Sequence, residues 1–133
     1  MRFMKKNLLI FILAALLLLG LVACTYNPDG ARQNTLTTIV LDENPTTGYT
    51  WAVSIDNLAV VRQFSDSYTP KQAPSGIVGT GGTHSYIFQA VSPGTAVITF
   101  ELGQQWNGGQ KGVETKKYTV TVNQDGTILA AEM

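Results

Sequence analysis

The sequence has little of the chemistry that most catalytic and metal-binding sites require. Its 133 residues include one Cys and one His. A single Cys cannot form an internal disulfide, and it excludes zinc and iron–sulfur sites built from several cysteines. A single His excludes multi-histidine metal sites and leaves little room for histidine-based catalysis. We therefore expect no bound metal and no cofactor.

Charge is also scarce. Charged residues make up 14% of the chain, and nine basic residues balance nine acidic ones. Because there is no basic excess, nothing indicates a nucleic-acid partner. Hydrophobic residues make up 44%, which argues against a disordered polar chain. The length predicts a single folded domain.

The apolar residues are concentrated near the start of the chain. Arg2, Lys5 and Lys6 precede an unbroken apolar run at residues 8–19. A basic start, a short apolar stretch and small residues near a cleavage site are typical of a secretory signal. A retained membrane anchor is the alternative, but the 16 residues 8–23 are fewer than the roughly 20 that span a bilayer.

The Leu-Val-Ala-Cys sequence that ends this segment resembles a bacterial lipobox. The resemblance implies that Cys24 carries lipid and becomes the first mature residue. We therefore expect a cleaved signal peptide at residues 1–23, a lipid-anchored tether at 24–34 and a folded domain at 35–133. The mature chain would hold six basic and nine acidic residues, a net charge of −3. Its expected location is the cell envelope, anchored to a membrane and facing the periplasm or the exterior.

Short strand-like runs follow the tether. They are residues 35–41, 50–55, 58–64, 85–91, 96–102 and 115–122. Four of them alternate apolar and polar residues, which puts one face in a core and the other in water. The residues expected to be largely buried are Trp51, Val53, Tyr86, Phe88, Ile98, Phe100, Tyr118 and Val120. The pattern predicts a monomeric, all-β, immunoglobulin-like β-sandwich, with a small barrel as the alternative. We expect no long helix after residue 24.

Three loops between these runs have unusual compositions. The first comprises Asn44, Pro45, Thr46, Thr47, Gly48 and Tyr49. Pro45 fixes its own φ, and Gly48 permits a positive φ, so this loop can fold back tightly. It is either a rigid, solvated connector or the tip of a binding surface.

The second and third loops are rich in glycine. The second, at residues 76–83, contains Gly79, Thr80, Gly81 and Gly82. Its glycines either let another surface approach the main chain closely or make this loop a flexible hairpin tip. A strand follows it instead of a helix, so a phosphate-binding role is not favoured. The third, at residues 103–112, contains Gln104, Gln105 and Trp106. Trp106 is either folded back on the core or exposed for contact.

In order and spacing, the three loops resemble the signature motifs of the chagasin family of cysteine-peptidase inhibitors. That family carries an Asn-Pro-Thr-Thr-Gly-aromatic motif, a Gly-x-Gly-Gly motif and an Arg-Pro-Trp motif. The first two are matched throughout, whereas Gln104 and Gln105 replace the Arg and Pro of the third. The match covers residues 35–122.

The resemblance implies a sandwich with the three loops clustered at one end. It also implies a reversible, non-covalent inhibitor of papain-like cysteine peptidases that is not itself an enzyme. The first loop is expected to enter the active-site cleft, and the other two to clamp its walls.

Two alternatives belong to other classes of protein. One is an envelope binding or assembly module that keeps the fold without inhibiting a peptidase, since a fold does not determine function. The other is an enzyme that uses His84 and Ser85, but adjacent strand residues point to opposite faces. No G-x-S-x-G motif is present. We interpret His84 as a residue at the entry of a strand.

Overall fold

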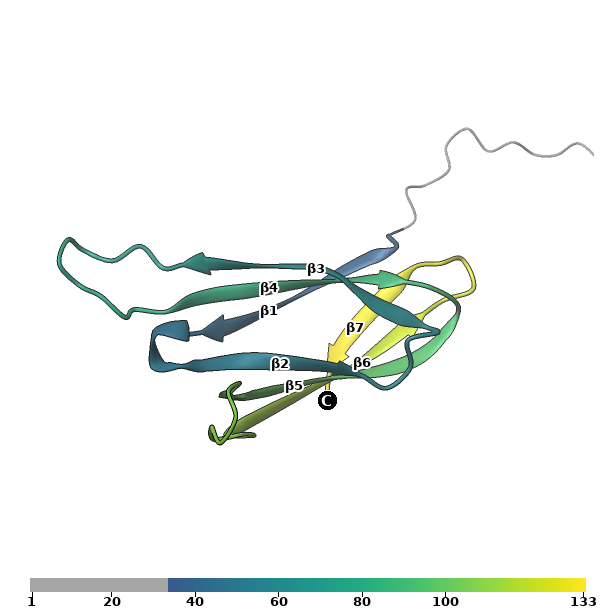
Figure 1. Ribbon diagram of the computed structural model, residues 1–133. Helices are drawn as coiled ribbons and strands as arrows, with labels where there is room; N and C mark the ends of the chain where they lie inside the picture. Colours follow the sequence, from purple (N-terminus) through teal and green to yellow (C-terminus); the bar gives the residue numbers. More distant parts are fainter. Residues whose placement is uncertain (1–33) are drawn as a thin grey trace, which may run out of the picture. The chain divides into compact units, whose positions relative to one another are not determined.

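The computed structural model describes residues 34–133, so the signal segment and Cys24 lie outside the described residues. Seven β-strands and one 3-10 turn form within this range (Figure 1). In chain order they are β1 (Leu36–Glu43), η1 (Pro45–Thr47), β2 (Tyr49–Ile55), β3 (Val61–Pro70), β4 (Gly82–Ala90), β5 (Gly94–Gln104), β6 (Glu114–Val122) and β7 (Ile128–Glu132). No helix in residues 34–133 is long and apolar enough to cross a membrane.

The strands form two sheets, one of order β1-β4-β3 and one of order β2-β5-β6-β7. All neighbouring strands are antiparallel. Figure 1 shows the three-stranded sheet lying over the four-stranded one. The predicted all-β, immunoglobulin-like sandwich is confirmed.

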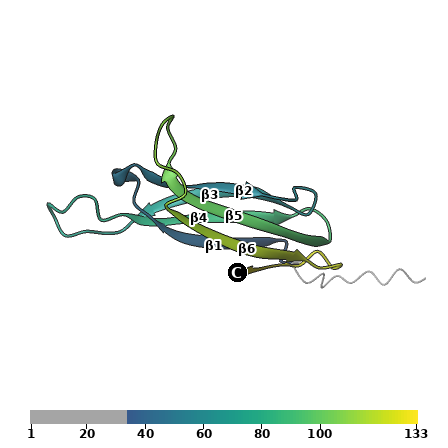
Figure 2. The same ribbon diagram turned by 90° about the horizontal axis from the view of Figure 1, so that it is seen from below.

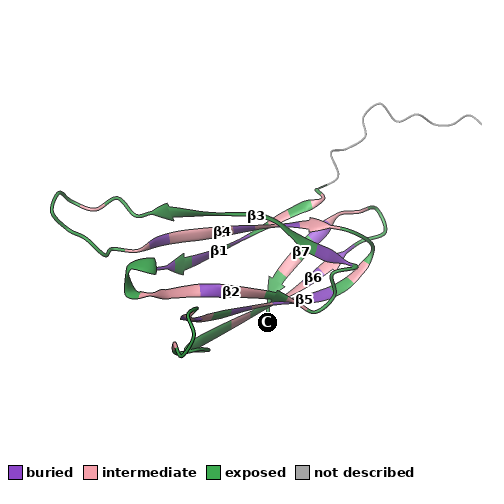
Figure 3. Cartoon of the chain, in the orientation of Figure 1, coloured by how far each residue is buried: buried purple, intermediate pink, exposed green. Residues whose placement is uncertain are grey.

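Buried residues occur on strands of both sheets (Figure 3). The core is organised around Phe100, which is fully buried. Its ring packs edge-on against Trp51, Tyr86, Phe88 and Tyr118 at centroid distances of 5.1 to 6.4 Å. Six of the eight predicted core residues are buried, whereas Val53 and Tyr118 are only partly buried and pack against the core from its margin. Among residues 34–133, the core cluster extends from Ile39 on β1 to Ile128 on β7 and so takes members from both sheets.

The strand predicted at residues 58–64 is wrong in its bounds. The main chain turns at Asn57, whose side-chain oxygen accepts from the N–H of Ala59 and whose carbonyl accepts from Val60. This turn leaves Leu58 exposed, and β3 begins only at Val61. It then continues to Pro70 with almost every residue exposed, because β3 is the edge of its sheet (Figure 3). An edge strand of this kind has no alternation of polarity from which its length could be read.

The sequence prediction also missed β7. This strand has only five residues and adds to the outside of β6, with Ile128 as its buried member. Its remaining residues include two alanines and no aromatic side chain, so it lacks the composition typical of strands.

Candidate functional site

The three loops singled out from the sequence lie side by side at one end of the sandwich. They connect β1 to β2 (residues 44–48), β3 to β4 (residues 71–81) and β5 to β6 (residues 105–113). Each connection leaves its sheet at the same end, as the two views in Figures 1 and 2 show. The contacts between them, described next, make the loops one surface.

The first loop is a compact turn held by its own hydrogen bonds. Pro45 begins the 3-10 turn, where its fixed φ suits the helical conformation. Gly48 ends the turn at a φ of 81°, a left-handed conformation that only glycine adopts readily. The Thr46 hydroxyl donates to Oδ1 of Asn44 at 2.5 Å, and the Thr47 hydroxyl donates to the Asn44 carbonyl at 2.6 Å. Both hydroxyl protons are therefore used inside the loop, and the oxygens remain as acceptors at its tip.

Asn44 joins the first loop to the second. Its Nδ2 donates to the carbonyl oxygen of Gly79 at 2.8 Å. At Gly81 a Cβ would come within 2.9 Å of the Glu43 carbonyl oxygen, and φ is +71°. Glycine at this position thus lets the second loop approach the end of β1. Thr80 is exposed on the same loop.

Gly82, the last of the predicted contact residues in the second loop, is the first residue of β4 and is buried. A Cβ there would lie 2.2 Å from the carbonyl oxygen of Thr69 on β3. Its lack of a side chain is needed for the close pairing of two strands inside the molecule. The second loop therefore ends at residue 81, two residues before the end of the loop predicted at residues 76–83.

The third loop is held in shape by the two glutamines that precede Trp106. The side-chain oxygen of Gln104 accepts from the N–H of Gln110 at 2.9 Å. Nε2 of Gln105 donates to the carbonyl oxygens of Thr50 and Gly103, both at 3.1 Å. These side chains connect the base of the third loop to β2 and β5.

Trp106 bridges the third loop to the first and remains half exposed, at 52%. A Cβ added at Gly48 would come within 2.6 Å of Cη2 of Trp106, so the indole lies directly against the Gly48 backbone. Nearby, the Tyr49 hydroxyl donates to Oε1 of Gln110 at 2.9 Å. The sequence left open whether Trp106 folds back on the core or is exposed for contact. In the structure one part of the ring packs on a neighbouring loop, and the rest faces solvent.

Two apolar residues of the second loop were missed by the sequence analysis. Ile77 is 54% exposed and Val78 is 92% exposed, although both are aliphatic. The sequence signal that could have identified them is an apolar pair placed between two glycines, Gly76 and Gly79, in a loop. A cleft of about 530 Å³ is lined by both the first loop and the second, which contributes Thr80 and Gly81, and its apolar lining includes Tyr49, Leu102 and Val113. Such exposed apolar surface beside a rigid turn is suited to contact with another protein.

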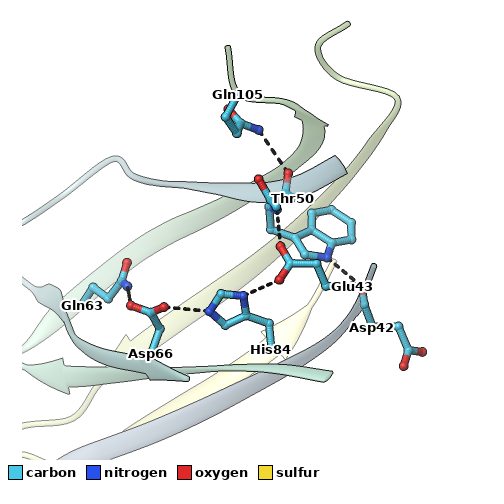
Figure 4. Close-up of polar contacts among 8 residues, drawn as sticks. Asp42, Glu43, Thr50, Gln63, Asp66, His84 and Gln105 are labelled. Atoms are coloured by element: carbon cyan, nitrogen blue, oxygen red, sulfur yellow. Dashed lines mark hydrogen bonds and ion pairs between the residues drawn. The ribbon is translucent and has the colours of Figure 1, made fainter. Parts of the chain in front are cut away.

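Charged side chains gather beneath the first loop, where Glu43 is buried at the end of β1 (Figure 4). One oxygen of its carboxylate is 2.6 Å from Nδ1 of His84, and Nε2 of His84 is 2.7 Å from Asp66. Burial lowers the pKa of His84, but hydrogen bonds and charges from Asp66 and Glu43 outweigh burial and raise it overall. In residues 34–133 no three His, Cys, Asp or Glu side chains are grouped as metal ligands would be.

The sequence model described as chagasin family peptidase inhibitor I42 matches residues 31–122. Among solved structures, the chain is similar to EhICP2, a cysteine protease inhibitor from Entamoeba histolytica. The TM-score is 0.57 at 26% identity, covering 65% of this chain and 77% of that one. It is also similar to amebosin, with a TM-score of 0.48 at 26% identity over 68% of this chain and 81% of that one. Among curated proteins none matches.

Proposed function

The chain belongs to the chagasin family of peptidase inhibitors, and from this premise we propose that it reversibly inhibits papain-like cysteine peptidases by inserting its three loops into the active-site cleft. The single observation that carries the proposal is that Trp106, Gly48 and Gly79 bring the three family motifs into one contiguous surface. The similarity to EhICP2, itself a cysteine protease inhibitor, supports it. Membership in an inhibitor family also agrees with the expectation that the chain is not an enzyme.

The first loop has the properties of a wedge. Its turn is fixed by Pro45 and by hydrogen bonds from Thr46 and Thr47, so little conformational entropy would be lost on binding. The tip presents hydroxyl oxygens as acceptors, which a protonated catalytic His could approach. Because the tip is a 3-10 turn, it does not offer the extended main chain that a substrate strand offers.

The other two loops supply apolar contact on either side of the wedge. Trp106 offers the exposed part of its indole on one side, and Ile77 and Val78 extend from the second loop on the other. Aromatic residues of this kind commonly dominate the binding energy of an interface. Gln104 and Gln105 act within the loop here, so we assign them to holding Trp106 and not to direct contact.

An inhibition assay tests this proposal. We expect residues 32–133, which form a compact unit with their own core, to inhibit papain-like peptidases reversibly and to leave a trypsin-like serine peptidase unaffected. Inhibition that is lost on dilution would establish reversibility. If no member of a papain-like panel is inhibited, the alternative of an envelope binding module without inhibitory activity replaces the proposal.

We also propose that the mature protein is a monomer held on a membrane of the cell envelope by lipid on Cys24. Replacing Cys24 by serine is expected to abolish labelling with a radioactive fatty acid and to release the protein from the membrane fraction. Thr25→Ala is the matched control, because it alters the next residue and leaves the lipid acceptor intact. Unchanged membrane retention of the Cys24→Ser protein would favour an uncleaved anchor instead.

A further inference from the structure

Glu43 lies at the base of the first loop and connects the strands on either side of it. Its side chain is 2% exposed. One carboxylate oxygen accepts from the main-chain N–H of Trp51 on β2 at 2.8 Å, although Glu43 itself belongs to β1 of the other sheet. The indole N–H of Trp51 returns a bond to the carbonyl of Asp42 at 2.9 Å. The buried carboxylate and the indole N–H therefore both join the two strands that carry the loop.

The other oxygen of this carboxylate contacts His84, which is enclosed by groups from three strands. Glu43 of β1 faces Nδ1, and Asp66 of β3 faces Nε2 (Figure 4). The Tyr86 ring of β4 stacks on the imidazole at 4.2 Å, and the Tyr68 ring of β3 meets it edge-on at 6.2 Å.

Both nitrogens of His84 face carboxylates, which accept hydrogen bonds and cannot donate them unless protonated. A neutral imidazole carries one N–H, so it can satisfy only one of the two contacts. When both carboxylates are ionised, only an imidazolium can donate to both of them, and the nitrogen–oxygen distances are 2.6 and 2.7 Å. The stacked tyrosine face also favours a cation.

Resting on the inhibitory function proposed above, we propose that Glu43 and His84 are positioning residues for the first loop. Charged His84 compensates the buried carboxylate of Glu43, and Glu43 then holds β1 and β2 at the spacing that gives the loop its inhibitory shape. When His84 loses its proton, the buried carboxylate of Glu43 loses the cation with which it is in contact. The base of the loop then loosens, and inhibition weakens.

The direction of the pH dependence follows from the raised pKa of His84. A group with a higher pKa in the folded state contributes its full stabilisation below its unfolded pKa, and loses it as the pH rises through the folded value. Inhibition should therefore be strongest under mildly acidic conditions and weaken on the alkaline side of neutrality. Asp42 and Lys71, an exposed pair 3.3 Å apart near the same loop, should have no such effect.

The test measures the inhibition constant against papain between about pH 5 and about pH 9 for the parent, Glu43→Gln and the control Asp42→Asn. Ratios between variants at each pH cancel the peptidase's own titration. A glutamine at 43 can still accept from Trp51 without needing a cation beside it. The inhibition constant of the parent divided by that of Glu43→Gln should therefore rise by about tenfold from the acidic to the alkaline end of this range. The same ratio for the parent and Asp42→Asn should stay constant. A constant ratio for Glu43→Gln would overturn the proposal.

A second measurement on the parent alone needs no variant that might fail to fold. An NMR titration follows the His84 ring protons and the main-chain amides of Gly48 and Tyr49. We expect these amides to shift with the same midpoint as His84, above the ordinary histidine value. Amides that do not respond to His84 would overturn the positioning role. If they respond and papain is not inhibited, the positioning role stands and the proposed inhibitory function fails.

Discussion

Replacing Trp106 by alanine is expected to weaken inhibition of a papain-like peptidase by about thirtyfold. An aromatic anchor near the centre of an interface contributes about 2 kcal/mol or more on truncation, and each 1.4 kcal/mol is about a factor of ten. The structure adds a second reason, because the indole lies against Gly48 and supports the first loop. The thermal midpoint should stay nearly unchanged, since the ring lies outside the core.

The measurement is an inhibition constant and a melting curve for each protein. Phe64→Ala is the matched control, because Phe64 is a similarly exposed aromatic residue (57% against 52%) on β3, away from the three loops. We expect the control to inhibit like the parent. Equal inhibition by the Trp106→Ala and parent proteins would contradict the role of the third loop. A large fall in the midpoint would show that Trp106 is instead a structural residue.

Replacing Phe100 by alanine should lower the free energy of unfolding by about 3 to 5 kcal/mol, the range for deleting a buried phenyl ring. Phe100 is fully buried and contacts four other aromatic rings that come from both sheets. The free energy of unfolding of a small domain is only about 5 to 15 kcal/mol in total. This single change therefore removes a large part of the stability.

Urea unfolding checks this expectation through a lower midpoint with an unchanged slope. Leu129→Ala on β7 is the control, because this leucine is 63% exposed and should change the midpoint little. A loss below about 1 kcal/mol for Phe100→Ala would mean that the core has rearranged around the missing ring, contrary to the packing described above.

The fold was predictable wherever a strand has one buried face. Tyr86 and Phe88 on β4, and Ile98 and Phe100 on β5, occupy alternate positions of their strands and are buried as expected. The edge strand β3 has no such alternation because nearly all of it is exposed. Its pairing is determined by main-chain bonds to β4, with a bulge between Gln63 and Ser65, and the sequence carries no sign of either.

The site was predictable from the sequence only in part. The motif residues were identified by resemblance, and the structure places their loops together. The glycines of the second loop suggested close approach by another surface, but at Gly81 and Gly82 that surface belongs to the chain itself. His84 does lie near the entry of β4, as interpreted. Its contacts with Glu43 and Asp66 were not predictable, because only the strand order β1-β4-β3 brings these distant residues together.

The most direct test of the central claim compares binding of residues 32–133 to two forms of papain. One form has a free cleft, and in the other an irreversible, peptide-like blocker occupies the cleft and modifies the catalytic Cys. If the three loops enter the cleft, calorimetry should detect binding to the free form and none to the blocked form. Equal affinity for both forms would contradict this account, because the loops would then bind outside the active site.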